Sequence, residues 1–187
     1  MRSRWDTTAS ASIPSHVPAK VILQHVQSLV PTLQVNPSVT GFDEVSPNPD
    51  DIAKDPFFGP WDESERAFTV RETIYLAPGL TKDLVWPIAF QLTPTGARSR
   101  GDVSAGVVCW TLWTVRRCQD GSSPASDTTS SSTSTHAGDE WELCGDLIIE
   151  GNRLIMPFVT WRSHQILQLI CQGLVDGGVR SYLKMGL

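Results

Sequence analysis

Features that would indicate a membrane-spanning or nucleic-acid-binding protein are missing from this sequence. No apolar run approaches the 18 residues that mark a membrane-spanning helix. The 187 residues carry 15 Lys and Arg against 20 Asp and Glu, a formal net charge of -5, whereas a nucleic-acid-binding domain usually shows a basic face. The sequence therefore predicts neither a membrane span nor a nucleic-acid partner.

Closely spaced cysteines are lacking too. Cys109, Cys118, Cys144 and Cys171 form no Cys-x-x-Cys pair, the spacing found in many zinc and redox motifs. Reduced cysteines are typical of intracellular proteins, and the N-terminal residues have no apolar segment like that of a secretory signal. We therefore expect a cytoplasmic protein.

Motifs of the common enzyme classes are absent as well. The sequence has no phosphate-binding glycine-rich loop, no His-Glu-x-x-His and no Gly-x-Ser-x-Gly. The four histidines, His16, His25, His136 and His164, are far apart, whereas a metal site needs several ligands to converge. The sequence indicates no metal and no cofactor.

The length of the chain suits a single domain with a sizeable core. We expect residues 1–12 to be a flexible N-terminus and residues 13–187 to form one domain. Apolar residues three and four positions apart predict a helix over 18–33, which Pro31 would end or kink. The Ser- and Thr-rich residues 121–139 are expected to be a disordered loop, because so polar a tract cannot bury enough apolar surface.

The middle of the chain alternates apolar and polar residues, which predicts β-strands. Pro87 would confine its strand to a sheet edge or a bulge, and Gly101 and Gly106 would bend theirs. A Pro-, Asp- and Asn-rich stretch over 46–62 is typical of a surface loop. The expected strands span residues 38–45, 67–76, 84–92, 97–117 and 141–150.

A long closing helix is predicted over 156–182, with Gly177-Gly178 as a point where it would break. Strands that cluster between helices indicate an α+β fold. We expect a curved antiparallel sheet that grips the long C-terminal helix and leaves an internal apolar cavity between them.

Several short motifs resemble those of one superfamily: Leu33–Pro37, Ile74–Leu80, Gly96–Ser99, Val103–Gly106 and Phe158-Val159. The chain looks like a helix-grip protein of the START-like, Bet v 1-like and polyketide cyclase-like group, and more narrowly like a fungal family within it. It departs from that family at Val103–Gly106, where an Ala-Pro-x-Gly stretch is usual, and in its Ser- and Thr-rich insertion. The resemblance implies the fold and the cavity but transfers no catalytic residue.

Glu72 is the strongest candidate for a catalytic group. By alternation it shares a face with Phe68 and Val70, which should point inward. Burial would raise the pKa of its carboxyl group, which suits a general acid or base. Alternatively, a bulge shifts the register and turns Glu72 outward, or Glu72 pairs with a buried arginine.

Three kinds of side chain could assist Glu72. His164 in the closing helix would shuttle a proton if it faced the cavity, although a helical histidine is more often on the surface. Tyr75 is a second helper. Arg98 and Arg100 share one strand face and would hold an oxyanion if that face were inner; if it is outer, which we favour, they form a solvated charge ladder.

Aromatic side chains are candidates for the wall of the cavity. Seven tryptophans in 187 residues weakly favour an aromatic or polycyclic ligand, since aromatic rings stack on one another, although each of them could equally be ordinary core. The candidate ligand-binding residues, arginines included, are Phe68, Trp86, Phe90, Arg98, Arg100, Trp110, Trp113, Trp141 and Trp161.

These observations lead to one expected function and two alternatives. We expect a protein that binds a small hydrophobic metabolite and acts as a cofactor-independent cyclase or isomerase in fungal secondary metabolism of polyketides or terpenoids. A carrier of lipid or sterol would need the same cavity without catalysis. An accessory interaction protein would have a filled core and an exposed apolar patch.

Overall fold

The computed structural model describes residues 1–77, 80–118 and 140–186 of the chain. The tract predicted to be disordered, 121–139, lies outside these residues. Within them, no helix is long and apolar enough to cross a lipid bilayer.

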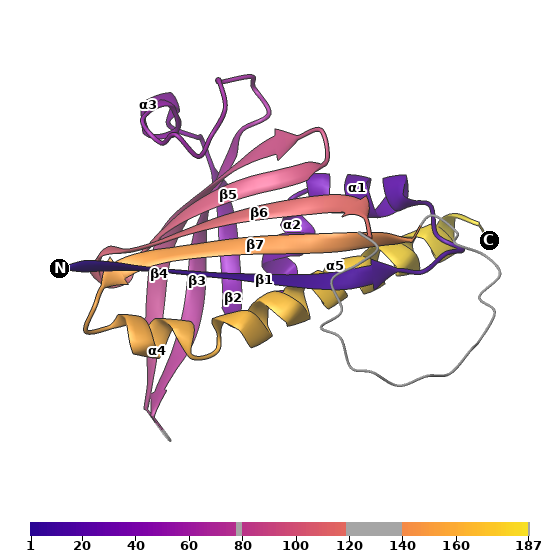
Figure 1. Cartoon of the computed structure of the whole chain (residues 1–187). Helices are drawn as coiled ribbons and strands as arrows, with labels where there is room; N and C mark the ends of the chain where they lie inside the picture. The colour runs from indigo at the N-terminus through magenta and orange to yellow at the C-terminus, as the bar shows by residue number, and fades with distance from the viewer. Residues whose placement is uncertain (78–79, 119–139, 187) are drawn as a thin grey trace, which may run out of the picture.

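Seven antiparallel strands form one curved sheet, in the order β1-β7-β6-β5-β4-β3-β2 (Figure 1). Consecutive strands β2 to β7 follow one another across the sheet, and each pairs with its neighbour in antiparallel register. The strands are β1 (Arg2–Ile13), β2 (Val39–Val45), β3 (Arg66–Ala77), β4 (Leu80–Thr93), β5 (Gly96–Val103), β6 (Val107–Arg117) and β7 (Trp141–Asn152).

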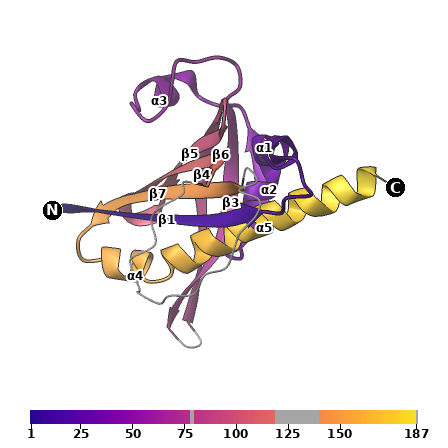
Figure 2. The same ribbon diagram turned by 45° about the vertical axis from the view of Figure 1, so that its right-hand side comes forward.

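One long helix crosses a face of this sheet, which we call the inner face (Figures 1 and 2). This helix, α5, packs on β1 and β7 and against α1. The expected α+β fold, a curved antiparallel sheet around a long C-terminal helix, is confirmed. The helices are α1 (Ala19–Gln27), α2 (Val30–Gln34), α3 (Pro49–Ala53), α4 (Met156–Thr160), α5 (Ser163–Met185) and the 3-10 turn η1 (Ser104–Gly106).

The hydrophobic core lies between the inner face of the sheet and the helices. Alternation along each strand sends every second side chain into it. Burial of these groups is worth about 25 cal/mol per Å² of apolar surface, which makes the core the main source of stability. Its members include Phe68, Val70, Phe90, Ala97, Trp113, Leu143, Leu167 and Leu174.

The N-terminal residues form a strand, so the prediction of a flexible segment over 1–12 is wrong. β1 pairs with β7 residue by residue from Arg2 to Ile13. Its inward side chains at Ala9 and Ala11 are small and buried, and the Cys171 thiol of α5 lies 3.5 Å from the Ala9 carbonyl oxygen. Small side chains let the helix approach the strand closely, which compensates for their low hydrophobicity.

Both predicted long helices are divided in two. The first breaks at Leu29, which has a φ of 65° and separates α1 from α2 ahead of Pro31. The closing segment consists of α4 and α5, and α5 runs unbroken through Gly177 and Gly178. A side chain at Gly177 would lie 2.6 Å from the His25 ring of α1, so this glycine serves close helix packing.

Two expectations about the strands also need correction. Residues 97–117 are two strands, β5 and β6, joined by the tight turn η1 in which Gly106 has a φ of 73°. β4 lies inside the sheet, although it contains Pro87. The proline is tolerated because β4 pairs with β5 only from Ile88 onward, which leaves the β5 side of Pro87 unpaired.

Candidate ligand-binding site

Glu72 lies on the inner face of β3. It follows the fully buried Phe68 and Val70 at two-residue intervals, and the β3–β4 register runs without a shift from Arg66 to Tyr75. The register therefore points Glu72 inward, as its alternation predicted, and the alternative of a bulge that turns it outward does not apply.

The carboxylate of Glu72 is held by two hydrogen bonds. The indole Nε1 of Trp86 on β4 donates to Oε2 over 3.0 Å, and the Ser38 side chain provides a second hydrogen bond. Burial raises the pKa of Glu72, and the hydrogen bonds from Trp86 and Ser38 oppose that rise. Glu72 therefore keeps its proton to a higher pH than an exposed glutamate, which is the direction that favours a general acid or base.

A hollow of about 250 Å³ adjoins Glu72 between β2, β3 and β4. It is smaller than the roughly 300–1,000 Å³ of most ligand pockets, so it can hold a compact molecule or one end of a longer one. Its lining is mixed, with polar groups beside the apolar Leu84 and Val85. The lining residues are Thr40, Arg71, Glu72, Thr73, Asp83, Leu84 and Val85.

Polar groups at the rim of the hollow are already paired with one another. The Thr73 hydroxyl donates to Asp83 over 2.7 Å, and the guanidinium of Arg71 forms an ion pair with Asp43 of β2. That ion pair holds the pKa of Asp43 below its ordinary value. The pKa of Glu72 is thus raised by burial, whereas that of Asp43 is lowered by its arginine partner.

Cys109 on β6 is a half-buried neighbour of this site that the sequence analysis missed. Burial raises the pKa of its thiol to about 12, and the charges of Glu72 and Asp102 add to the effect. The thiol stays protonated at neutral pH, so it is a poor nucleophile. Cys109 lies four residues before Trp113 on the same strand. Because side chains alternate along a strand, this even spacing was the sequence signal that both side chains face inward.

The expected aromatic wall is mostly packed core. Phe90 and Phe68 are fully buried, with ring centroids 5.9 Å apart in an edge-to-face arrangement. Trp86 and Trp113 are also buried, while Trp141 is half-buried with Arg117 over its ring. Within the described part of the chain, the buried Nε1 of Trp113 has no hydrogen-bond partner, so a bound acceptor atom could satisfy it.

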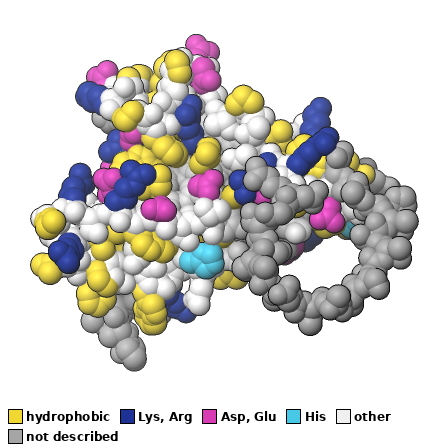
Figure 3. Space-filling model, in the orientation of Figure 1, with side chains coloured by type: hydrophobic (Ala, Val, Ile, Leu, Met, Phe, Trp, Pro, Cys, Tyr) yellow, Lys and Arg dark blue, Asp and Glu magenta, His cyan; other side chains and the backbone are white. Residues whose placement is uncertain are grey.

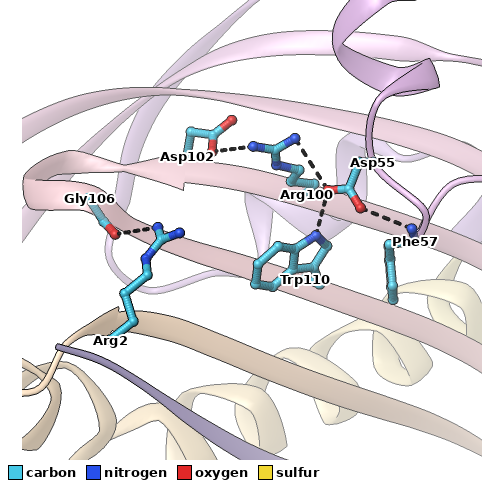
Figure 4. Close-up of polar contacts among 7 residues, drawn as sticks. All are labelled: Arg2, Asp55, Phe57, Arg100, Asp102, Gly106 and Trp110. Atoms are coloured by element: carbon cyan, nitrogen blue, oxygen red, sulfur yellow. Dashed lines mark hydrogen bonds and ion pairs between the residues drawn. The ribbon is translucent and has the colours of Figure 1, made fainter.

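Arg100 and Trp110 lie on the outer face, away from Glu72. Both contact the buried Asp55, which follows α3: Trp110 Nε1 donates to Oδ2 over 2.7 Å, and Arg100 Nη1 lies 3.2 Å from the same oxygen (Figure 4). Arg100 also pairs with Asp102 over 2.9 Å. The proposal that Arg100 and Trp110 line the inner cavity is therefore corrected.

Arg98 is on the outer face too, where it does not form a solvated ladder. Its Nε donates to Gln91 and its Nη1 to the Phe57 carbonyl, each over 2.8 Å. Gln91 in turn donates to the buried Glu65 over 2.6 Å. The stretch over 46–62, predicted to be a surface loop, is thus held on the outer face by buried polar contacts.

The other predicted helpers do not meet Glu72. His164 is exposed, and its Nδ1 lies 3.0 Å from the Thr7 hydroxyl of β1, while Glu72 contacts β4 and Ser38. Trp161 is 81% exposed and lies outside the core. The side chain of Tyr75 is outside the described residues. No group of three His, Cys, Asp or Glu side chains suited to a metal occurs in the described ranges.

The contact between Trp86 and Glu72 can be tested through Gly101, because a Cβ there would lie 2.6 Å from Trp86 Cζ3. We expect Gly101→Ala to displace the indole, which would cost about 1–3 kcal/mol and raise the pKa of Glu72 further through loss of the hydrogen bond. NMR titration of the Glu72 carboxyl group measures this. Trp86→Phe, which removes the N–H donor without a clash, should raise the pKa in the same way; an unchanged titration in both variants would contradict the assignment.

Comparison with known proteins identifies a family and the fold. A family model described as a domain of unknown function, DUF7053, matches residues 2–178. The curated proteins gave no match. TTHA0849 from Thermus thermophilus is similar in structure, with a TM-score of 0.58 at 11% identity over 95% of this chain and 99% of that one. The Zhui aromatase/cyclase from Streptomyces sp. R1128 gives 0.56 at 7% identity over 95% of each chain. At these identities the likeness shows the helix-grip fold alone.

Proposed function

The chain belongs to the DUF7053 family, and from that premise and the geometry around Glu72 we propose that it binds a small, mostly apolar molecule at the hollow between β2, β3 and β4. The observation that carries this proposal is a half-buried carboxyl group whose pKa is raised and which lines a hollow of about 250 Å³. Burial of an ionisable group is unfavourable unless something compensates for it, and such groups cluster at functional sites.

Binding would combine apolar contact with one directed hydrogen bond. Leu84 and Val85 would contact the apolar part of the molecule. Glu72 would accept a hydrogen bond from an N–H or O–H of the ligand when ionised, and donate one to a carbonyl oxygen when protonated. Trp86 and Ser38 would fix the orientation of the carboxyl group.

For catalysis we propose a cofactor-independent isomerisation or cyclisation. The Glu72 carboxylate would remove a proton from a carbon next to a carbonyl group, which leaves an enolate. In an isomerisation the resulting carboxylic acid would return the proton to another carbon. In a cyclisation the enolate carbon would form a bond to a second carbonyl carbon of the same molecule, and the acid would protonate the alkoxide that this bond formation leaves. Neither step consumes a co-reactant. The likeness to a protein named aromatase/cyclase supports this class only at the level of the fold, and we place the reaction in fungal polyketide or terpenoid metabolism from the resemblance in sequence.

A carrier of lipid or sterol is the second candidate. The observation that favours it is the lack of a second titratable helper: within the described residues, Glu72 has Trp86 and Ser38 as its hydrogen-bond partners rather than a histidine or tyrosine. A carrier needs one polar anchor and no proton transfer. Release of the ligand unchanged would separate it from an enzyme.

Binding can be measured with the neutral fluorescent probe N-phenyl-1-naphthylamine, which has one N–H donor. We expect Glu72→Gln to weaken binding about tenfold, because a hydrogen bond to a charged group is worth about 1.5–3 kcal/mol. Wild-type binding should strengthen as the pH rises through the pKa of Glu72, since only the carboxylate accepts from the probe. Fluorescence titration at several pH values gives both results.

The matched control is Glu140→Gln, which makes the same change at an exposed position just before β7. It should bind the probe like the wild type. Equal affinities of the wild type and both variants at every pH would overturn the placement of the ligand at Glu72.

A further inference from the structure

An uncharged eight-residue segment between two arginines forms the link from β7 to α5. Leu154 to Trp161 reads Leu-Ile-Met-Pro-Phe-Val-Thr-Trp, with Arg153 before it and Arg162 after it. The segment contains α4. So apolar a stretch would normally be buried on all sides, and here it is not.

One side of the segment belongs to the protein interior. Met156 is buried and packs with Val107 and Ile149 of the sheet, and Ile155 and Val159 contact the same small cluster. These contacts fix α4 against the end of β7. The segment is thus an ordered part of the fold, and the position of its remaining side chains is defined.

The opposite side presents large apolar groups to solvent. Leu154, Phe158 and Trp161 are 79%, 78% and 81% exposed; Phe158 lies in α4, and Leu154 and Trp161 lie in the turns just before and after it. Together with Arg153 and Arg162 we call them the α4 patch. Figure 3 shows hydrophobic side chains gathered over α4, with Lys or Arg side chains beside them.

Cations surround the apolar groups of the α4 patch. Arg153 and Arg162 are exposed, and the guanidinium of Arg162 lies 5.9 Å from the Trp161 ring centroid. Arg2 joins the same end of the molecule, because the Arg153 N–H donates to the carbonyl of the adjacent Met1. This concentration of positive charge stands out in a chain with a net charge of -5.

We propose that the α4 patch docks on the surface of a lipid bilayer that contains anionic headgroups. Trp and Phe side chains favour the headgroup region, and flanking arginines are attracted by anionic lipids. A protein partner fits less well, since stable protein interfaces use about 20–30 residues a side. Three apolar groups and their cations are enough for reversible attachment to a membrane surface.

The docking geometry also suits delivery of an apolar ligand. Figures 1 and 2 place α4 and the adjoining ends of β3 and β4 on the same side of the molecule, and the hollow beside Glu72 lies between β2, β3 and β4. A docked protein would therefore turn this side toward the lipid. The delivery of a ligand rests on the proposed function. The docking of the α4 patch on a membrane does not, because it is argued only from the exposed apolar side chains and arginines of that patch.

Co-sedimentation with lipid vesicles tests the proposal. We expect the wild-type chain to pellet with vesicles of roughly 7:3 phosphatidylcholine and phosphatidylserine, and much less with pure phosphatidylcholine or at high salt. Phe158→Ser/Trp161→Ser should weaken binding about tenfold or more, since both side chains would insert. Arg153→Gln/Arg162→Gln should remove the preference for the anionic vesicles.

Leu183→Ser is the matched control, because it removes an exposed apolar side chain outside the α4 patch. Leu183 lies near the C-terminal end of α5, more than 20 residues after Trp161. It should pellet like the wild type, and so should Glu72→Gln, which separates this test from that of the ligand. The proposal is overturned if wild-type protein stays in the supernatant, if the Phe158/Trp161 variant pellets normally, or if size measurements show a dimer that this variant dissociates.

Discussion

Replacing Phe90 with alanine is expected to lower the free energy of unfolding by about 3–5 kcal/mol, the largest effect of any change considered for this protein. Phe90 is fully buried on the inner face of β4. Its ring lies edge-to-face with Phe68, which in turn packs against Phe42 of β2 at 6.0 Å. Removal of the ring leaves a cavity at one end of this aromatic row.

Thermal unfolding measures the effect, with a fall in the midpoint of about 2–4 °C for each kcal/mol in a chain of this size. Phe90→Leu is the graded control, since it refills most of the volume and should cost much less. The result also bears on the role of Phe90. A side chain that lines an empty ligand cavity has few packing partners on that side, so its removal costs little stability. If Phe90→Ala lowers the free energy of unfolding by less than about 1 kcal/mol, Phe90 faces open space rather than packed core.

Replacing Asp55 with alanine should cost about 3 kcal/mol, the lower end of the range for removal of one partner from a buried ion pair. Asp55 accepts hydrogen bonds from Trp110 Nε1 and from the backbone N–H of Phe57, and it pairs with Arg100. All three donors would lose their acceptor. The lower end of the range applies because the Arg100 side chain is 27% exposed and can regain some water.

The effect of Asp55→Ala should be local as well as global. Because Asp55 joins the segment after α3 to the sheet, we expect trypsin to cleave at Lys54 faster in the variant than in the wild type. Asp102→Ala is the control: it removes the half-exposed partner of the same arginine, and exposed ion pairs are worth about 0–1 kcal/mol. Equal losses of stability in the two variants would show that Asp55 does not anchor the segment.

Alternation along β3 was enough to predict the orientation of Glu72. Apolar residues at Phe68 and Val70 fix the face, and no bulge intervenes before Glu72. The same logic left β5 open, because Ala97, Ser99 and Gly101 are too small to mark an inner face by hydrophobicity. Those small residues do face inward: the Trp86 ring fills the space beside Gly101.

The partners of Arg98 and Arg100 were beyond prediction from local sequence. Pro, Asp and Asn residues make the segment after β2 look like a solvated loop, and nothing local shows that Asp55 and Glu65 become buried. Their burial depends on strands that are distant in sequence. β1 was missed for a similar reason, because its small side chains form a strand only when β7 pairs with them and α5 packs on them.

The two edge strands of the sheet, β1 and β2, affect whether copies of this protein associate in a concentrated solution. Each end strand offers unpaired backbone groups to which a strand of another copy could add. Along β1, the exposed Arg4 and Asp6 would place charges beside any added strand. Along β2, the register shifts between Val39 and Gly41, and Asp43 and Glu44 are exposed. Strand addition is therefore disfavoured at both ends, so the open sheet can stay long and curved without polymerising.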